Sequence, residues 1–373
     1  MKEGWEYKRL EDCLISIPKQ KEVKTKDYKT FGAFPIISQD STLISGYSDD
    51  SEKVFKHAKP VIVFGDHTKN IKYIDFDFIV GADGTKILMP KDNIVSKFFY
   101  YVIKSFRISD LGYARHYRLL KEQEVPVPPL SEQHRIVSYL DAAFAKIDAV
   151  AKNAEDALNE AKALFQSALT KMMEPKEGWE EKTLLEIGKT QTGTTPSKSN
   201  SAFYGDYMPF IRPSEINYDG LGNLNYNSEI KLSKEGSESG RVFKTGSILM
   251  VCIGATISKV GYNEQDVSCN QQINVITPYD GFNYKFIYYA MTAPKFKAKV
   301  INEGTSSQAT LPIINKRKWE QLSLAFPPID EQINIVDKLE IMHQKICNMS
   351  SNLTRTLSEC SALKQAILRQ TFE

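Results

Sequence analysis

The side chains that could carry out catalysis form no catalytic pattern in this sequence. The sequence has no Gly-x-x-x-x-Gly-Lys phosphate-binding loop, and no Gly-x-Gly-x-x-Gly follows an expected strand. Neither Pro-Pro pair is preceded by Asn or Asp, so the active-site tetrapeptide of an adenine methyltransferase is missing. The five histidines lack the spacing of metal ligands and stand at His57, His67, His116, His134 and His343. We therefore expect a protein that recognises or scaffolds rather than catalyses.

Metal and disulfide chemistry is equally unexpected. Asp75 and Asp77 could form a carboxylate pair, but such alternation is common on the face of a strand. The five cysteines are odd in number, widely spaced and free of any Cys-x-x-Cys. This pattern favours isolated thiols over a zinc site or a disulfide framework.

Polar and basic side chains instead gather in loops between short apolar runs. Such loops offer hydrogen-bond donors and acceptors at the surface. In the first half of the chain they span residues 65–70, 81–86 and 112–118, and in the second half residues 192–196, 212–214, 254–261, 270–272 and 304–308.

The segments that must position these loops occur twice in the sequence. Glu3-Gly4-Trp5-Glu6 returns as Glu177-Gly178-Trp179-Glu180. Pro-Pro-Leu-Ser-Glu-Gln from residue 128 returns as Pro-Pro-Ile-Asp-Glu-Gln from residue 327, and the segment from Ala163 returns from Ala362. The last two repeats share an offset of 199 residues, whereas the first is offset by 174. Each half therefore combines a variable globular stretch with a repeated segment of constant length.

The repeated segments predict two long helices. Ser131 to about Met173 and Asp330 to about Phe372 contain neither Pro nor Gly, and the Pro-Pro pairs prevent extension backwards. Apolar residues recur in steps of three and four, which favours a coiled-coil seam. The expected seam residues are Leu140, Phe144, Ile147, Leu158 and Phe165 in the first helix and Leu339, Met342, Ile346, Leu353 and Leu363 in the second.

The predicted fold class is α/β (α+β) with a pseudo-two-fold internal repeat. We expect two globular regions, head one (1–127) and head two (175–326), held apart by two antiparallel spacer helices (128–174 and 327–373). Helix two must run back along helix one if their apolar stripes pack together. No apolar run approaches the roughly 20 residues of a membrane helix, and the N-terminus has no signal-peptide core, so a cytoplasmic protein is expected.

The chain resembles the specificity subunit of type I restriction–modification systems. The resemblance covers nearly the whole chain and depends on the two Pro-Pro-x-x-Glu-Gln segments with long helices behind them. Gly-Trp at the start of each head, Gly81-Ala82-Asp83-Gly84, Arg115-His116-Tyr117 and Asn270-Gln271 are also typical of the family.

The resemblance implies a non-catalytic subunit that binds double-stranded DNA and two methyltransferase subunits, with restriction subunits completing the complex. Each head would recognise half of an asymmetric bipartite site, and the helices would set the spacer. Adenine would be methylated. S-adenosylmethionine, ATP and magnesium are expected on the partner subunits, and no cofactor on this chain.

Loop residues able to contact bases or phosphates are the candidate DNA-binding residues. Any one of them could instead be a solvated or structural polar group. In head one they are His67, Thr68, Lys69, Lys86, Arg115, His116, Tyr117 and Arg118. In head two they are Thr194, Thr195, Arg212, Ser214, Lys259, Gln271, Ser307 and Gln308.

Two alternatives from other classes stay open from the residues alone. One is a non-catalytic coiled-coil scaffold for protein partners, and the other is a self-sufficient nuclease, which the missing acidic metal cluster disfavours. Outer helix faces, including Ile136 and Ile335 off the seam, are expected docking sites for the methyltransferase subunits.

Overall fold

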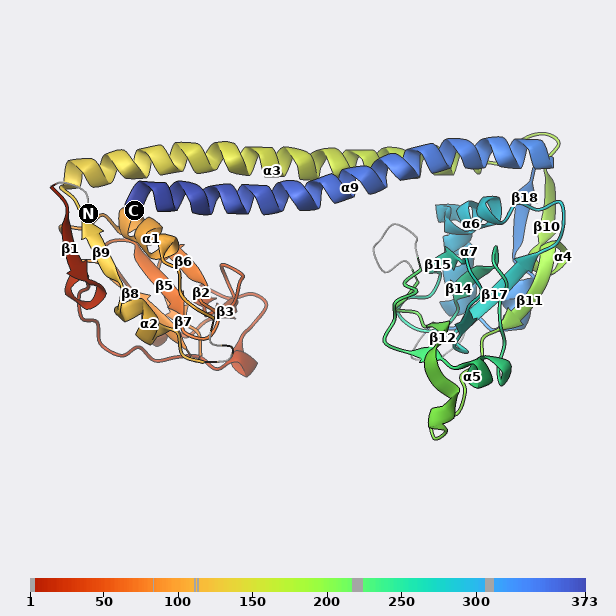
Figure 1. The fold of residues 1–373 in the computed structure, drawn as a ribbon, viewed down its shortest axis with the longest axis horizontal. Coiled ribbons are helices and arrows are strands. Elements are labelled where there is room, and N and C mark those ends of the chain that lie inside the picture. Colours follow the sequence, from red (N-terminus) through yellow and green to blue (C-terminus); the bar gives the residue numbers. More distant parts are fainter. Residues whose placement is uncertain (1–3, 83, 111, 113, 217–223, 306–311) are drawn as a thin grey trace. The chain divides into compact units, whose positions relative to one another are not determined.

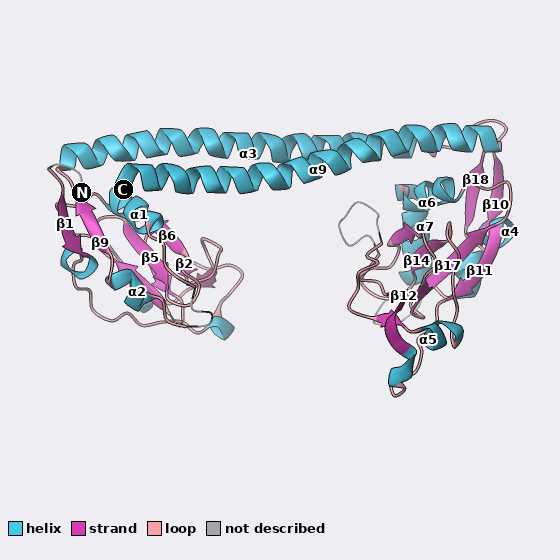
Figure 2. Cartoon of the chain, in the orientation of Figure 1, coloured by secondary structure: helices cyan, strands magenta, loops and turns pink. Residues whose placement is uncertain are grey.

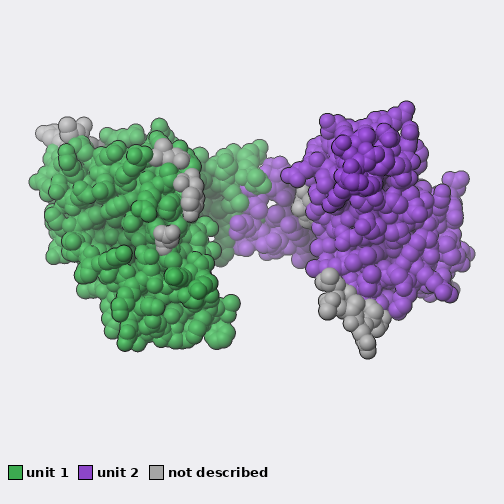
Figure 3. Space-filling model, turned by 90° about the horizontal axis from the view of Figure 1, so that it is seen from below, with its two compact units in different colours: residues 1–154, 354–373 green, residues 155–353 purple. Residues whose placement is uncertain are grey.

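The computed structural model describes residues 4–82, 84–110, 112, 114–216, 224–305 and 312–373. The chain divides into two compact units, which Figure 3 distinguishes by colour. Unit 1 contains residues 1–154 and 354–373, and unit 2 contains residues 155–353. Each unit therefore holds one head together with parts of both long helices.

Unit 1 is a mixed α/β structure (Figures 1 and 2). Its strands are β1 (Glu6–Arg9), β2 (Phe34–Ile37), β3 (Gly46–Ser48), β4 (Val54–Phe55), β5 (Val61–Gly65), β6 (Ile71–Ile74), β7 (Phe78–Val80), β8 (Thr85–Leu88) and β9 (Glu124–Val127). Its helices are α1 (Ser96–Ser105), α2 (Tyr117–Lys121), the first part of α3 (Leu130–Met172) and the last part of α9 (Ile329–Phe372), besides the 3-10 turns η1 (Leu10–Cys13), η2 (Thr25–Asp27) and η3 (Ser51–Lys53).

The strands of unit 1 form three small sheets, ordered β3-β2-β7-β4, β6-β5-β8 and β1-β9. Strands β2 and β7 are parallel, with Ile37 opposite Val80, while β5 is antiparallel to both of its neighbours. The strand β5 is buried throughout, as its run of Val, Ile, Val and Phe predicts for a central strand. Because β5 is central, its carboxyl end fixes where the following loop begins.

Unit 2 repeats this plan with different lengths. Its strands are β10 (Glu180–Thr183), β11 (Gly188–Thr192), β12 (Tyr204–Ile211), β13 (Lys231–Leu232), β14 (Ile248–Val251), β15 (Val260–Tyr262), β16 (Ser268–Cys269), β17 (Ile273–Pro278) and β18 (Ser323–Phe326). Its helices are α4 (Leu184–Ile187), α5 (Lys234–Glu238), α6 (Tyr284–Thr292), α7 (Pro294–Thr305) and α8 (Lys316–Glu320), with the 3-10 turn η4 (Ser201–Phe203) and the remaining parts of α3 and α9.

The pairing of strands shows which parts of the two heads correspond. The strands of unit 2 are ordered β11-β17-β14-β15, β13-β12-β16 and β10-β18. The parallel pair β12 and β16 matches β2 and β7: Gly81 N donates to Ile37 O at 2.8 Å, and Asn270 N donates to Ile211 O at 3.1 Å. Strand β14 likewise takes the place of β5, and β17 that of β8. The internal repeat is therefore structural as well as sequential.

The two long helices are confirmed, and their segments run antiparallel within each unit. In unit 1, Asp148 pairs with Lys364, and Tyr139 and Gln370 line one recess. In unit 2, Phe165 contacts His343 with ring centroids 6.0 Å apart. Of the predicted seam residues, Leu140, Phe144, Ile147, Leu158, Phe165, Leu339 and Ile346 are buried, and Met342 and Leu353 are partly buried.

The prediction that Leu363 lies in the seam is wrong, since this side chain is 50% exposed. An α-helix has 3.6 residues per turn, so a stripe in strict steps of three and four drifts off the contact line. In the last turns Leu368 is buried instead, and Lys364 lies with its Nζ 5.6 Å from the centre of the Phe144 ring.

Ile136 and Ile335 are not exposed docking residues either. Ile136 is 4% exposed in the core of unit 1, and Ile335 is 6% exposed in the core of unit 2. Each side chain is therefore part of the core of its own unit. Neither residue therefore lies on the exposed face of its helix.

The repeated glutamine of Pro-Pro-x-x-Glu-Gln joins each long helix to its head. Gln133 is fully buried; its Oε1 accepts from Val95 N at 2.8 Å, and its Nε2 donates to Asn93 O and Pro128 O. Gln332 is 2% exposed; its Oε1 accepts from Asn283 N at 3.0 Å, and its Nε2 donates to Pro327 O. Each glutamine thus accepts a hydrogen bond from the backbone N–H just before a head helix, α1 or α6. The N–H groups at the start of a helix have no partner within it.

A second joint lies two turns further along each long helix. In unit 1, Asp141 accepts from Lys97 Nζ at 2.8 Å and from Tyr101 OH at 2.5 Å. In unit 2, Glu340 accepts from Lys285 Nζ at 2.5 Å and from Tyr289 OH. The same acid, lysine and tyrosine arrangement therefore fixes α1 on α3 and α6 on α9.

All five cysteines are free thiols, and three of them are buried: Cys13, Cys252 and Cys269. Among the described residues, no helix is long and apolar enough to span a membrane.

Candidate nucleic-acid interface

Three loops of head one converge at one end of the β6-β5-β8 sheet. They follow β5, precede β8 and precede α2, and Asp66 holds them together. The Asp66 side chain is 3% exposed and accepts from Tyr117 N at 2.8 Å, while its backbone oxygen accepts from His116 N and Nδ1. Its own N–H donates to Gly84 O at 2.7 Å. The end where these loops meet is opposite the end where Gln133 attaches the long helix.

Gln39, which follows β2, adds a fourth loop to this cluster. Its Oε1 accepts from His67 N at 3.0 Å, and its backbone oxygen accepts from Thr68 Oγ1 at 2.5 Å and Asn70 Nδ2 at 2.9 Å. Lys69 has a φ of 59°, which allows the tight turn between β5 and β6. The predicted loop residues of head one are thus brought together, although the cluster as a whole is larger than predicted.

Arg115 and Arg118 are the exposed arginines next to this loop cluster. Both side chains are exposed, and neither has an ion pair or hydrogen bond within the described residues. Lys86 lies with its Nζ 6.0 Å from the centre of the Tyr117 ring, and burial raises the pKa of that tyrosine. Lys69 Nζ forms an ion pair and hydrogen bond with Asp110 at 2.9 Å, and this contact lowers the pKa of the aspartate. Free guanidinium groups on a fixed loop suit contact with base edges or phosphates.

His116 is fully buried, so its side chain is not available for a DNA contact in this structure. It lies directly after exposed Arg115 and before Tyr117, and its backbone and ring nitrogens both bond to Asp66 O. His116 therefore positions the loop that presents Arg115.

The corresponding loops of head two also converge. Gly193 N donates to Ile273 O, and Thr194 N donates to Cys269 O at 2.9 Å. Thr194 Oγ1 accepts from Arg241 N at 3.1 Å, and Thr195 Oγ1 donates to Gln271 Oε1 at 2.5 Å. Thr195 and Gln271 are both exposed, so their side chains form a surface pair at the carboxyl ends of β11 and β16.

Arg212 and Ser214 lie beside this pair but are committed to a buried carboxylate. Arg212 donates two side-chain hydrogen bonds to Glu215, at 3.1 and 2.7 Å, and Ser214 Oγ donates at 2.9 Å. Burial raises the pKa of Glu215, but these hydrogen bonds outweigh it and the net pKa is lowered. Lys259 Nζ donates to Pro213 O at 3.4 Å. These three predicted residues therefore support the loop after β12 in this structure.

Ser307 and Gln308 lie outside the described residues. Three residues important for the geometry were missed by sequence reasoning: Gln39, Asp66 and Arg241. The only signal for Asp66 was its place after a buried strand. Arg241, which bonds to Thr192 O and to Thr194, lies far from both in sequence, so nothing in the sequence pairs them.

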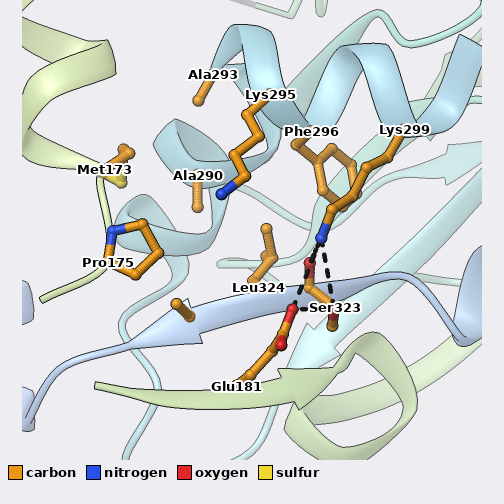
Figure 4. Close-up of a pocket in the computed structure, with 11 residues that line it drawn as sticks. Met173, Pro175, Glu181, Ala290, Ala293, Lys295, Phe296, Lys299, Ser323 and Leu324 are labelled. Carbon is orange, nitrogen blue, oxygen red and sulfur yellow. Dashed lines mark hydrogen bonds and ion pairs between the residues drawn. The ribbon is translucent and has the colours of Figure 1, made fainter. Parts of the chain in front are cut away.

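A recess elsewhere in unit 2 contains none of the predicted DNA-binding residues. It lies between α7, β18 and the segment after α3, and Figure 4 shows Lys299 reaching toward Glu181 and Ser323. The Lys299 to Glu181 distance is 3.7 Å, and Lys299 Nζ donates to Ser323 O at 3.3 Å. Because none of the predicted residues lines it, this recess does not replace the loop cluster as the candidate interface.

Comparison with known proteins identifies the class to which this architecture belongs. The sequence matches the family described as "Type I restriction modification DNA specificity domain" twice, over residues 2–160 and 176–355. The chain therefore belongs to this family. It is a DNA sequence-specificity subunit of a type I restriction–modification system, with two target-recognition domains.

Relatives among curated proteins carry the same description. The chain is 26% identical over 364 residues to the type I restriction enzyme EcoR124I/EcoR124II specificity subunit of Escherichia coli, covering 92% of this chain and 86% of the relative. It is 29% identical over 177 residues to the HindI specificity subunit of Haemophilus influenzae, covering 47% of this chain and 38% of that protein.

Solved structures share the fold. One, from work on complex assembly and conformational transition of the type I R-M system, has a TM-score of 0.69 at 20% identity, covering 100% of this chain and 98% of the other. The HsdS subunit from Thermoanaerobacter tengcongensis has a TM-score of 0.50 at 19% identity, covering 99% and 97%.

Proposed function

We propose that this chain directs adenine methylation to an asymmetric bipartite DNA sequence, with one half recognised by each head. The observation that carries the proposal is that loops converge at one end of the sheets in both heads but present unlike side chains. Head one offers Arg115, Arg118 and Lys86, whereas head two offers Thr195 and Gln271. A bidentate Arg favours guanine and a bidentate Gln favours adenine, so unlike loops favour unlike half-sites.

The partners we propose are two methyltransferase subunits, and restriction subunits in the complete enzyme. The long helices offer them exposed apolar side chains: Leu164 is 65% exposed in unit 2, and Leu363 is 50% exposed in unit 1. These two leucines occupy equivalent positions, 199 residues apart, so the chain offers equivalent surfaces to two copies of one partner. We propose that each leucine belongs to an apolar patch that contacts the partner protein.

The chain itself is proposed to be non-catalytic and to act in the cytoplasm. S-adenosylmethionine would bind to the methyltransferase subunits, and ATP and magnesium to the restriction subunits. This chain would bind none of them. Its contribution would be the choice of sequence and the spacing of the two half-sites.

The test is to co-express the chain with the methyltransferase encoded beside it and to map adenine methylation across a host genome by single-molecule sequencing. We expect one asymmetric bipartite motif, absent when this chain is omitted. A soluble complex that leaves no new methylated motif would refute the proposal. Replacing head two with that of a relative should change only one half of the motif.

The proposed role of the helices as a spacer has its own test. Inserting one heptad into both α3 and α9 adds roughly 10 Å to each helix, at about 1.5 Å per residue. This length corresponds to about three base pairs at roughly 3.4 Å each. The preferred spacer should lengthen by that amount, and an active complex with an unchanged spacer would contradict the role.

A further inference from the structure

A run of lysines follows the first strand of head one and was not among the predicted contacts. Lys19, Lys21, Lys24 and Lys26 fall within eight residues, and all four side chains are exposed. None of the four has an ion pair within the described part of the chain, although Lys21 lies close enough to Asp50 to contribute to lowering its pKa. Lys24 and Lys26 are the two that lie between backbone anchors, at Val23 and Tyr28.

The backbone around these two lysines is fixed at both ends to the candidate interface. On one side, Val23 N donates to Val80 O at 3.0 Å, and Val23 forms a parallel bridge with Gly81. On the other side, Tyr28 OH accepts from Ala82 N at 3.1 Å. Both anchors therefore bond to the stretch 80–82, which leads toward β8, the strand that carries Lys86.

The anchors are buried while the lysines are not. Val23 is 5% exposed and packs with Ile36 and Ile79, and Tyr28 packs against the same cluster. Between them, η2 turns the chain so that Lys24 and Lys26 project from a short, held segment. Little backbone entropy is left to lose when a ligand binds there, because the backbone is already ordered.

The equivalent place in head two carries one lysine instead of two. The bond from Val23 N to Val80 O corresponds to the bond from Thr194 N to Cys269 O, since β7 and β16 are equivalent strands. The segment that follows reads Thr195-Pro196-Ser197-Lys198-Ser199, with a single lysine. Head two thus offers hydroxyl groups where head one offers paired ammonium groups.

We infer that Lys24 and Lys26 bind backbone phosphates of the DNA beside the half-site recognised by head one. The inference rests on the proposed function. A lysine ammonium is a compact point charge on a flexible stem, which suits phosphate contact without base specificity. At this place head one therefore offers two lysines for phosphate contact, whereas head two offers one.

The test uses the complex of the full chain with its methyltransferase and a DNA duplex containing the mapped motif. Each phosphate contact contributes about 0.9 to the slope of log affinity against log salt. The variant Lys24→Gln/Lys26→Gln should lower the steepness of that slope by about 1.8. Between 50 and 200 mM salt, the parent complex should then lose about 12-fold more affinity than the variant does. Fluorescence anisotropy titrations at four salt concentrations measure both slopes.

Lys91→Gln is the matched control. Lys91 is also exposed in head one, but it follows Leu88, at the end of β8 away from the loop cluster. The slope of log affinity against log salt for Lys91→Gln should equal that of the parent. The melting temperatures of the parent, the double variant and the control should agree, because every substituted side chain is exposed.

The outcomes separate this inference from the proposed function. A lower slope with an unchanged methylated motif supports the inference. An unchanged slope with an unchanged motif overturns the inference and leaves the proposed function in place. A folded double variant that changes the motif also overturns it, because the lysines would then recognise bases. A parent complex that methylates no motif refutes the proposed function, and the inference with it.

Discussion

Gln133 is the side chain on which the attachment of head one to its long helix should depend most. It is fully buried and makes three hydrogen bonds, all to backbone groups: Val95 N, Asn93 O and Pro128 O. Gln133→Ala removes all three hydrogen bonds at once. It leaves one backbone donor and two backbone acceptors without their partner.

The expected cost follows from these three groups. A buried polar group left without its partner costs about 1–3 kcal/mol. Three groups, with partial relaxation, give a loss of roughly 3–6 kcal/mol for unit 1. For a unit of this size, each kcal/mol lowers the melting temperature by about 2–4 °C, so a fall of at least roughly 6–12 °C is expected. Gln332→Ala removes two hydrogen bonds instead of three and should cost unit 2 roughly 2–4 kcal/mol.

Differential scanning calorimetry of the full chain measures the size of the loss, and hydrogen exchange measured by mass spectrometry locates it. Protection should fall first in α1, whose first turn Gln133 satisfies. Gln133→Met is the informative companion, because it keeps the length of the side chain and loses the hydrogen bonds. Gln166→Ala, at an exposed position of α3, is the control and should change stability by less than about 0.5 kcal/mol.

Two results would refute this reasoning. If Gln133→Ala lowers the melting temperature by no more than the Gln166 control, the hydrogen bonds do not support the joint. If Gln133→Met restores the parent stability, packing volume and not polar satisfaction holds the helix to the head.

Three further predictions concern the seam, the interface and pH. Leu339→Ala, at a fully buried position, should cost about 2–5 kcal/mol in urea unfolding, whereas Leu363→Ala, at a half-exposed one, should cost under about 1 kcal/mol. Arg115→Gln should weaken binding of the target duplex by about 1–3 kcal/mol and relax one base position, as a methylation map would reveal. Burial raises the pKa of Glu340, but hydrogen bonds from Lys285 and Tyr289 lower it overall. The stabilisation by ionised Glu340 is therefore fully present above the ordinary pKa of glutamate and is lost as the pH falls through the lowered pKa. Glu340→Gln should therefore make the stability of unit 2 depend less on pH below about pH 4.5.

The parts of the fold that sequence could predict are those governed by local rules. The start of α3 at Leu130 and of α9 at Ile329 follows from the Pro-Pro pairs, because proline cannot continue a helix backwards. The buried strand β5 follows from its continuous apolar run. Leu363 was misplaced because a fixed step of three and four ignores the drift of a 3.6-residue helix.

The site was harder to predict because hydrogen bonds that composition does not reveal, both local and long-range, decide the role of each polar side chain. Arg212 reads in sequence as a free cation, but Glu215, three residues away, accepts two of its hydrogen bonds. His116 reads as a basic surface residue, but the carbonyl of Asp66, 50 residues earlier, lies beneath it. Composition shows that a loop is polar. It does not show which of its polar groups are already paired.

The comparison of the two halves explains how one architecture can serve two sequences. What the halves share lies where head meets helix: a buried glutamine and an acid bonded to lysine and tyrosine, at Gln133 and Asp141 in one and Gln332 and Glu340 in the other. What they do not share lies at the opposite end of each sheet. A head can therefore change its loops without disturbing its attachment, since no hydrogen bond of either joint described above reaches the loop cluster. Exchange of base preference at one head should then leave the spacer and the other half-site unchanged.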